Sequence, residues 1–187
     1  MIPYGRHSLD KTDFEAVAAA LRGERITQGP TVEAFEAAVA ARVEARHVVA
    51  FSSGTSALYA AADALGLSPG DEVITTPNTF VATANAIVHA GARPVLADID
   101  SETGSIDPAE VEARITPRTR AILAMDYAGH PCDYARLGAL AAARGIPLLA
   151  DACHAFGAEI SPGGVRTPVG SGRLAAMSVF SFHPVKT

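Results

Sequence analysis

Short apolar runs alternate with amphipathic stretches along most of this sequence, and this alternation limits the folds open to it. Several of the apolar runs are apolar at every position, as in strands that are buried on both faces of a parallel sheet. We predict strands at 47–52, 72–75, 93–97, 120–125 and 146–150, and helices at 10–21, 32–45, 55–65, 79–90 and 134–144. The order predicts a single α/β domain in which helices cover a mostly parallel sheet. Thr31 is a candidate N-cap for the second helix.

Composition narrows the class of protein without identifying a function. The 187 residues are enough for one domain with a real core, and 49% hydrophobic residues with a net charge of −5 indicate a globular chain. The mild acidity argues against a nucleic-acid surface. We expect no membrane span and no signal peptide, because no apolar run has the required length. Cys132 and Cys153 make no disulfide framework, which is typical of a reducing cytoplasm.

Four segments follow predicted strands, where ligands gather in open α/β sheets. Ser52 to Leu58 turns from a strand into a helix, and the free amides of a helix N-terminus stabilise an anion. Taken alone, most such turns are only helix caps. In the segment from Thr75 to Phe80, the Phe80 ring is placed to stack on a flat cofactor, although a core phenylalanine would give the same pattern.

The third segment begins with Asp151, a carboxylate at the end of an apolar strand, which needs a cationic partner if it is buried. His154 follows three residues later and is placed to face the same ligand. A helix cap or a metal ligand remains an alternative for the aspartate, and a structural role for the histidine. Cys153 is expected to be a packing residue. A zinc site at 130–133 is not predicted, because no second ligand pair accompanies it.

The fourth segment, residues 178–186, is a short apolar strand that runs into a turn carrying a lone lysine, Lys186. A lone lysine near a chain end is normally solvated, but this one follows an apolar strand. Ser181 is the polar exception in that strand and is placed to donate to a phosphate. A lysine that can form an imine and a carboxylate that can hold a protonated pyridine nitrogen are what pyridoxal phosphate chemistry requires.

From residue 2 to Lys186 the sequence resembles the DegT/DnrJ/EryC1/StrS family of sugar aminotransferases. The resemblance implies a three-layer, fold-type-I transferase domain that binds pyridoxal 5'-phosphate. It also implies a role for each motif residue: Gly54, Thr55, Ser56 and Ser181 at the cofactor phosphate, Phe80 stacked on the ring, Asp151 at the pyridine nitrogen, His154 near the phenolic oxygen, and Lys186 as the covalent attachment and proton carrier.

Residues 2–6, 27–30, 76–85 and 181–186 are most similar to the branch of this family that acts in pseudaminic acid biosynthesis. This similarity implies amino transfer, with glutamate as donor, to C4 of a UDP-linked 4-keto-6-deoxy-N-acetyl-hexosamine. It places Tyr4, Thr27 and Gly54 near the nucleotide sugar. It also implies a homodimer whose partner subunit completes the active site.

Three alternatives remain open. One is an aminotransferase acting on another nucleotide-linked keto sugar. A second is a sugar dehydratase of the same family, although such enzymes carry histidine where this sequence has Lys186. The third is a noncatalytic remnant, because family members continue beyond the region matched here. Residues 1–187 would then be an N-terminal segment and most of the cofactor-binding large domain, without the small C-terminal domain. We expect such a polypeptide alone to be poorly soluble or inactive.

Overall fold

A five-stranded, fully parallel sheet forms the centre of the molecule in the computed structural model, which describes residues 7–186. The spatial order of the strands is β2-β1-β3-β4-β7. Their bounds are Glu72–Thr75 for β1, Arg93–Leu96 for β2, Thr119–Met125 for β3, Leu148–Asp151 for β4 and Met177–Val179 for β7. The prediction of an α/β fold with a mostly parallel sheet is confirmed.

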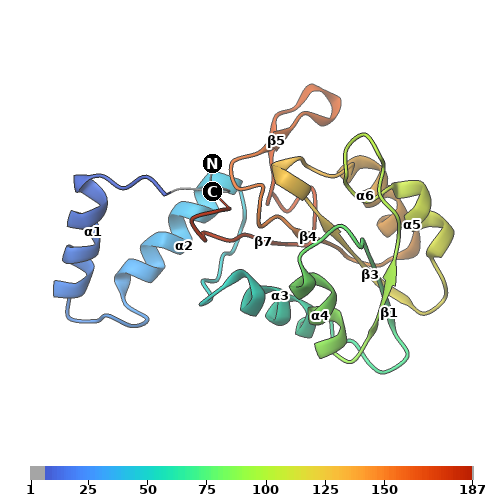
Figure 1. Ribbon diagram of the computed structural model, residues 1–187, viewed down its shortest axis with the longest axis horizontal. Coiled ribbons are helices and arrows are strands. Elements are labelled where there is room, and N and C mark those ends of the chain that lie inside the picture. Colours follow the sequence, from blue (N-terminus) through green and yellow to red (C-terminus); the bar gives the residue numbers. More distant parts are fainter. Residues whose placement is uncertain (1–6, 187) are drawn as a thin grey trace, which may run out of the picture.

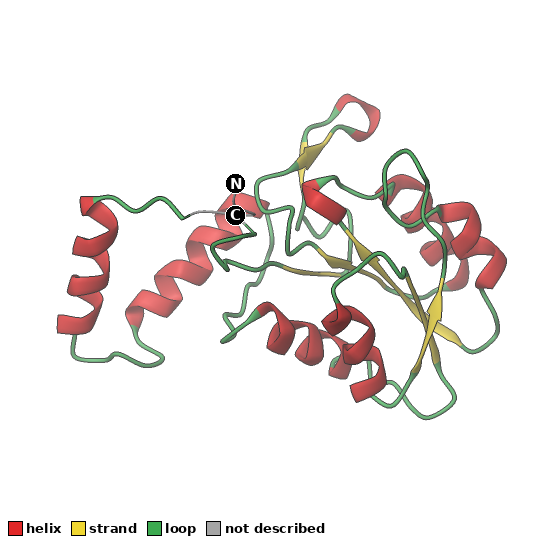
Figure 2. Ribbon diagram, viewed as in Figure 1, coloured by secondary structure: helices red, strands yellow, loops and turns green. Residues whose placement is uncertain are grey.

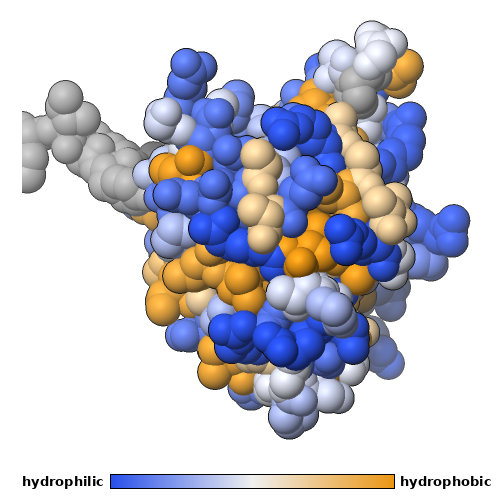
Figure 3. Space-filling view, turned by 90° about the vertical axis from the view of Figure 1, so that its right-hand side faces the viewer, coloured by the Kyte–Doolittle hydropathy of each residue, from blue (hydrophilic) through white to orange (hydrophobic). Residues whose placement is uncertain are grey.

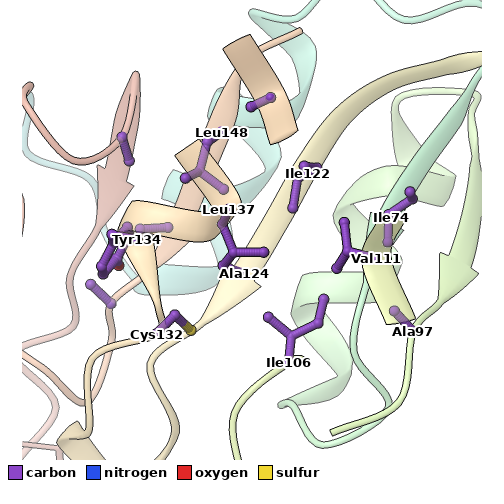
Figure 4. Close-up of a cluster of buried hydrophobic side chains, with 14 of the residues drawn as sticks. Ile74, Ala97, Ile106, Val111, Ile122, Ala124, Cys132, Tyr134, Leu137 and Leu148 are labelled. Atoms are coloured by element: carbon purple, nitrogen blue, oxygen red, sulfur yellow. The ribbon is translucent and has the colours of Figure 1, made fainter. Parts of the chain in front are cut away.

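Helices cover both faces of this sheet and make three layers (Figure 1). Helices α3 (Gly54–Asp63) and α4 (Val81–His89) lie on one face, and α5 (Pro108–Arg114) and α6 (Tyr134–Arg144) lie on the other. The period of two along β1 explains this arrangement. Val73 packs in a cluster with Ile87 of α4, whereas its neighbour Ile74 packs in a cluster with Leu137 of α6 (Figure 4).

Two helices precede the α/β body. Helix α1 (Lys11–Arg22) buries no residue, and Figure 1 shows it standing away from the sheet. Its apolar side chains Phe14, Val17 and Leu21 are all more than half exposed. Helix α2 (Pro30–Val43) buries Val39 and Val43 near its C-terminal end, so the second helix is anchored and the first is not.

The remaining elements are short (Figure 2). Strands β5 (Glu159–Ile160) and β6 (Thr167–Pro168) pair antiparallel, and the 3-10 turns are η1 (Tyr127–Gly129) and η2 (Pro162–Gly164). Hydrophilic and apolar residues are interspersed on the face shown in Figure 3. Within residues 7–186, no helix is both long and apolar enough to cross a membrane.

A buried carboxylate fixes the edge of the sheet where the strands begin. Glu72, at the start of β1, is 1% exposed and accepts hydrogen bonds from Arg93 (2.5 Å), Thr116 (2.7 Å) and Arg118 (2.7 Å). The bond from Arg93, followed by those from Thr116 and Arg118, lowers the pKa of Glu72 to about 2. Strands β1, β2 and β3 are therefore held together at this end by one anion.

The structure corrects the predicted strand at 47–52. The segment belongs to no helix and to no sheet. A strand needs a neighbour to accept its amide protons, whereas the Ala50 amide donates to the Glu36 side chain at 2.7 Å. Val49 and Phe51, which were expected inside a sheet, are 67% and 47% exposed.

Smaller differences concern the elements that sequence reasoning placed inexactly. Helix α5 was not predicted, although Asp107 caps it and Pro108 occupies its first turn, because it is only seven residues long. The N-cap of α2 is Gly29, without a side-chain hydrogen bond, so the Thr31 cap was wrong. The last strand ends at Val179, which leaves Ser181 in the turn that follows.

Candidate functional site

A cavity of about 1820 Å³ opens where β4 and β7 end and α3 begins. In an open parallel sheet this is the edge at which strand ends and helix N-termini meet. Seven of the residues singled out from the sequence line this one cavity: Gly54, Thr55, Phe80, Asp151, His154, Ser181 and Lys186.

Asp151 is the last residue of β4 and is 1% exposed. Its carboxylate accepts a hydrogen bond from the Thr83 hydroxyl at 2.6 Å and from the Cys153 amide at 3.3 Å. Both donors are neutral. A buried carboxylate with only neutral donors among the described residues has unused capacity for a cation, which suits a protonated ring nitrogen.

Sequence reasoning missed Thr83, which comes from α4 and orients this carboxylate. The Thr83 hydroxyl also lies 2.7 Å from that of Thr79, which precedes α4. The signal was present in the sequence as two threonines four residues apart, at the start of a helix that follows a strand. Threonines are common near helix starts, so only the contact with Asp151 distinguishes this pair.

Lys186 lies in the turn after β7, where its backbone amide donates to the His183 carbonyl at 2.8 Å. Its Nζ is 2.6 Å from Nε2 of His154 and 5.7 Å from the centroid of the Phe80 ring. Burial, and then the charge of Lys186, lower the pKa of His154. The turn therefore brings together the amine, the imidazole and an aromatic face that sequence reasoning assigned to one ligand.

The N-terminus of α3 closes another side of the cavity. Ser53 and Ser56 form a reciprocal capping box, with both backbone-to-hydroxyl distances at 3.1 Å. A Cβ at Gly54 would lie 3.2 Å from the Cys153 sulfur and 3.4 Å from the Ser181 Cβ. Glycine therefore allows the first turn of α3 to approach the turn after β7, which concentrates amide and hydroxyl donors in one place.

Two of the predicted residues, Ser56 and Thr27, do not line the cavity. The Ser56 hydroxyl is engaged with Ser53 and is not among the groups that line the cavity. Thr27 is exposed in the loop between α1 and α2 and does not line the cavity either. Tyr4 lies outside the described residues. The Ser181 hydroxyl accepts from the His183 amide at 3.4 Å and stays on the cavity wall.

A second buried carboxylate, Asp126, follows β3 beside the site. It accepts from the Cys132 amide at 2.9 Å and the Tyr134 hydroxyl at 2.7 Å, and its own amide donates to the Asp151 carbonyl at 3.0 Å. Burial raises the pKa of Asp126. These bonds fasten the loop after β3 to the end of β4, a role that no sequence pattern indicated.

The two cysteines are packing residues in this arrangement. Burial raises the pKa of both thiols well above the usual range, so neither is poised as a thiolate nucleophile. Both are free and buried. Among the residues that the structure describes, no group of three or more histidine, cysteine, aspartate or glutamate side chains could hold a metal ion.

Three solved or curated proteins show how close the similarity is. The spore coat polysaccharide biosynthesis protein SpsC of Bacillus subtilis (strain 168) is 45% identical over 154 residues, which are 82% of this chain and 40% of that protein. PseC of Helicobacter pylori, an aminotransferase involved in the biosynthesis of pseudoaminic acid, superposes with a TM-score of 0.90 at 35% identity. The match covers 98% of this chain and 48% of PseC. Spr1654 of Streptococcus pneumoniae, a sugar aminotransferase solved in its PLP form, superposes with a TM-score of 0.89 at 32% identity. The match covers 99% of this chain and 50% of Spr1654.

The chain thus spans about half the length of the solved relatives it matches. A profile of the DegT/DnrJ/EryC1/StrS aminotransferase family matches residues 7–187. The match includes every described segment of the candidate site, from the start of α3 to the turn that carries Lys186. The chain therefore belongs to the DegT/DnrJ/EryC1/StrS aminotransferase family.

Proposed function

We propose that this chain carries the cofactor-binding site of a pyridoxal-phosphate-dependent sugar aminotransferase. The observation that carries the proposal is the meeting of Lys186, His154 and the buried Asp151 in one cavity. Family membership supports it, as do relatives solved in PLP and PMP forms. Residues 1–187 would form the N-terminal segment and most of the large domain of such an enzyme.

The residues present fit pyridoxal 5'-phosphate. Asp151 offers a buried carboxylate, with neutral donors only, to a protonated ring nitrogen. Gly54 keeps the N-terminal amides of α3 next to Ser181, where a phosphate dianion is stabilised by amides and the helix dipole. Thr55 lines the same wall, and Ser56 supports it through the cap. Phe80 contributes an exposed aromatic face, and Lys186 an amine.

Each of these residues then has a stated role in amino transfer. When bound, pyridoxal phosphate supplies an electron sink for the carbon that loses its proton. Lys186 would hold the cofactor through its amine, and the same amine would carry a proton at the α-carbon of the amino donor. Asp151 keeps the ring nitrogen protonated, and the Thr83 hydroxyl holds that carboxylate in place. His154 lies beside Lys186, and we propose that it would contact the phenolic side of the ring.

We also propose the chemical class of the two substrates. A UDP-linked 4-keto-6-deoxy-N-acetyl-hexosamine as amino acceptor and glutamate as donor agree with the similarity to PseC, whose role is in pseudoaminic acid biosynthesis. Spore coat polysaccharide biosynthesis, the role of SpsC, is also sugar metabolism. We propose a cytoplasmic homodimer in which the partner subunit completes the site, with Tyr4, Thr27 and Gly54 close to the nucleotide sugar.

The attachment residue is tested by trapping the cofactor on the complete protein. Borohydride reduction followed by peptide mass spectrometry is expected to place a phosphopyridoxyl group on Lys186. Residues 1–187 supply a control, because the only other lysine among them is Lys11, an exposed residue paired with Glu15 on α1. An adduct on Lys11 alone, or none on either lysine, would contradict the proposal.

A further inference from the structure

The first turn of α4 contributes to the candidate site at two points. Phe80 is the N-cap residue of α4 and lines the cavity, whereas Thr83 is the third residue of the helix and is 0% exposed. A phenylalanine side chain cannot accept a hydrogen bond from the free amides of a helix start, and Phe80 makes no such bond. Other contacts therefore hold this turn in place.

Two threonine hydroxyls supply these contacts. The hydroxyl oxygens of Thr79 and Thr83 lie 2.7 Å apart, and the Thr83 amide donates to the Phe80 carbonyl at 3.0 Å. The Thr83 hydroxyl also lies 2.6 Å from Oδ2 of Asp151, which comes 68 positions later in the sequence. Three side chains thus form one continuous chain of hydrogen bonds from the loop before α4 to the end of β4.

The chemistry of these groups determines the direction of each hydrogen bond. An ionised carboxylate only accepts, so the proton in the 2.6 Å contact belongs to the Thr83 hydroxyl. A hydroxyl has one proton, and Thr83 therefore accepts in its contact with Thr79. Thr79 donates to Thr83, and Thr83 donates to Asp151. Hydrogen bonds that are aligned in this way polarise and strengthen one another.

The backbone of Asp151 is fixed independently of this chain. The residue is paired with both β3 and β7, and its carbonyl accepts from the Asp126 amide at 3.0 Å. Rotation of the carboxylate is the freedom that remains. Oδ1 accepts from the Cys153 amide at 3.3 Å, which is longer than the usual N–H···O distance. The contact with Thr83 is therefore the closer of the two restraints on the carboxylate.

We propose that Thr79 and Thr83 are positioning residues that act through Asp151. Their directed chain of hydrogen bonds fixes the carboxylate and ties it to the helix start that carries Phe80. One helical turn would then set the distance between two contacts with the same cofactor ring, its face at Phe80 and its nitrogen at Asp151. The importance for amino transfer rests on the proposed function, whereas the chain itself can be tested in the cofactor-free protein.

Thermal unfolding of the complete, cofactor-free protein tests the chain first. Thr83→Val leaves a buried carboxylate oxygen without its donor, so we expect the unfolding midpoint to fall by about 3 °C or more. Thr75→Val is the matched control. Thr75 is equally buried, but its hydroxyl has no hydrogen-bond partner among the described residues, so its removal should leave the midpoint unchanged or raise it.

A double-mutant cycle then tests whether the two threonines act as one chain. Thr79→Val should lower the unfolding midpoint of the unaltered protein, and by less than about half as much in the Thr83→Val protein, where the acceptor of Thr79 is already lost. Equal effects in the two backgrounds would overturn the proposal. A Thr83→Val protein as stable as the Thr75→Val protein would also overturn it.

Single-turnover rates with glutamate, on the complete protein loaded with pyridoxal phosphate, test whether the chain acts through Asp151. Thr83 does not line the cavity, so Thr83→Val should slow the reaction about tenfold and leave half-saturation by glutamate within about twofold. Thr83→Ser keeps the hydroxyl, and its rate should stay within about threefold of the unaltered protein. In the Asp151→Asn background, Thr83→Val should add no more than about a twofold loss.

Losses that multiply in the double variant would overturn the proposal, because Thr83 would then act independently of the carboxylate. A Thr83→Ser protein as slow as Thr83→Val would also overturn it, since the hydroxyl would not be the group that matters. If borohydride does not trap the cofactor on Lys186, or the unaltered protein does not react with glutamate, the proposed function fails. The unfolding cycle in the cofactor-free protein then still decides whether the chain exists.

Discussion

At the scale of single residues, surroundings rather than residue type separate the buried carboxylates of this protein. Glu72 binds two arginines and a threonine, which is a complete set of partners for a structural anion. Asp126 is held by a tyrosine and a backbone amide. Asp151 has only Thr83 and one amide, and it alone lines the large cavity. Asp126 and Asp151 each accept from one hydroxyl and one amide, so it is the position on the cavity wall that marks Asp151 as the carboxylate for a ligand.

Asp151→Asn is expected to leave the cofactor bound and to slow amino transfer on the order of a hundredfold, because an amide cannot hold the charge of the ring nitrogen. Single-turnover rates from the amino donor, followed by absorbance of the bound cofactor, measure the effect. Asp98→Asn, a change at an exposed aspartate, is the matched control. Turnover near that of the control would show that another carboxylate holds the ring.

Glu72→Gln is expected to lower the free energy of unfolding by about 2 kcal/mol near neutral pH, since two charged hydrogen bonds are lost. The pKa of Glu72 is lowered from 4.5 to about 2 in the folded state. Its contribution is therefore fully present above pH 4.5 and is lost as the pH falls toward 2. Urea unfolding at pH 7 and at pH 3 should show a smaller difference between the two proteins at pH 3. A difference that grows on acidification would contradict this assignment.

At the scale of elements, the site is an assembly of segment ends. The first turn of α3, the start of α4, the end of β4 and the turn after β7 line the cavity, and the loop after β3 contacts His154 through the Ala128 amide. Their mutual approach depends on glycines at two positions. Gly54 lets α3 reach the turn after β7, and Gly129 lets the loop after β3 pass under His154.

Gly129→Ala is expected to destabilise the protein by about 1–2 kcal/mol, because φ is 82° and the new Cβ would lie 2.9 Å from the His154 carbonyl oxygen. Gly138→Ala is the control within α6. No atom lies within 4 Å of the added Cβ there, so the substitution should stabilise the helix by about 0.5–1 kcal/mol. Thermal unfolding of both variants shows whether the first loses stability and the second gains it. A neutral Gly129→Ala would show that the turn is not held as described.

At the scale of the whole molecule, the α/β body is well covered and the N-terminal part is not. The sheet is packed on both faces, whereas α1 exposes Phe14, Val17 and Leu21, and the unpaired segment 47–52 exposes Val49 and Phe51. Side chains of this size are normally covered in a soluble protein when they are contiguous.

We expect the polypeptide 1–187, expressed alone, to self-associate and to lack amino transfer from glutamate to a UDP-linked 4-keto sugar. The physical reason is its exposed apolar surface, together with a proposed active site that a partner subunit completes. Light scattering after size-exclusion chromatography, with an amino-transfer assay on each fraction, tests both parts. A monodisperse, monomeric and active product would contradict the expectation.

The sequence by itself determined the layer architecture, because apolar runs without polar alternation require a sheet that is covered on both faces. It also placed the segments that carry Phe80, Asp151 and Lys186 after strands of a parallel sheet, whereas the segment before α3 belongs to no sheet. It did not determine the state of residues 47–52, since a strand exists only if a neighbour pairs with it, and pairing is not local. For the same reason it missed Thr83, Asp126 and Ala128. Their partners lie 68, 8 and 26 residues away along the chain, and only the tertiary structure brings the hydroxyl to Asp151 and the amide to His154.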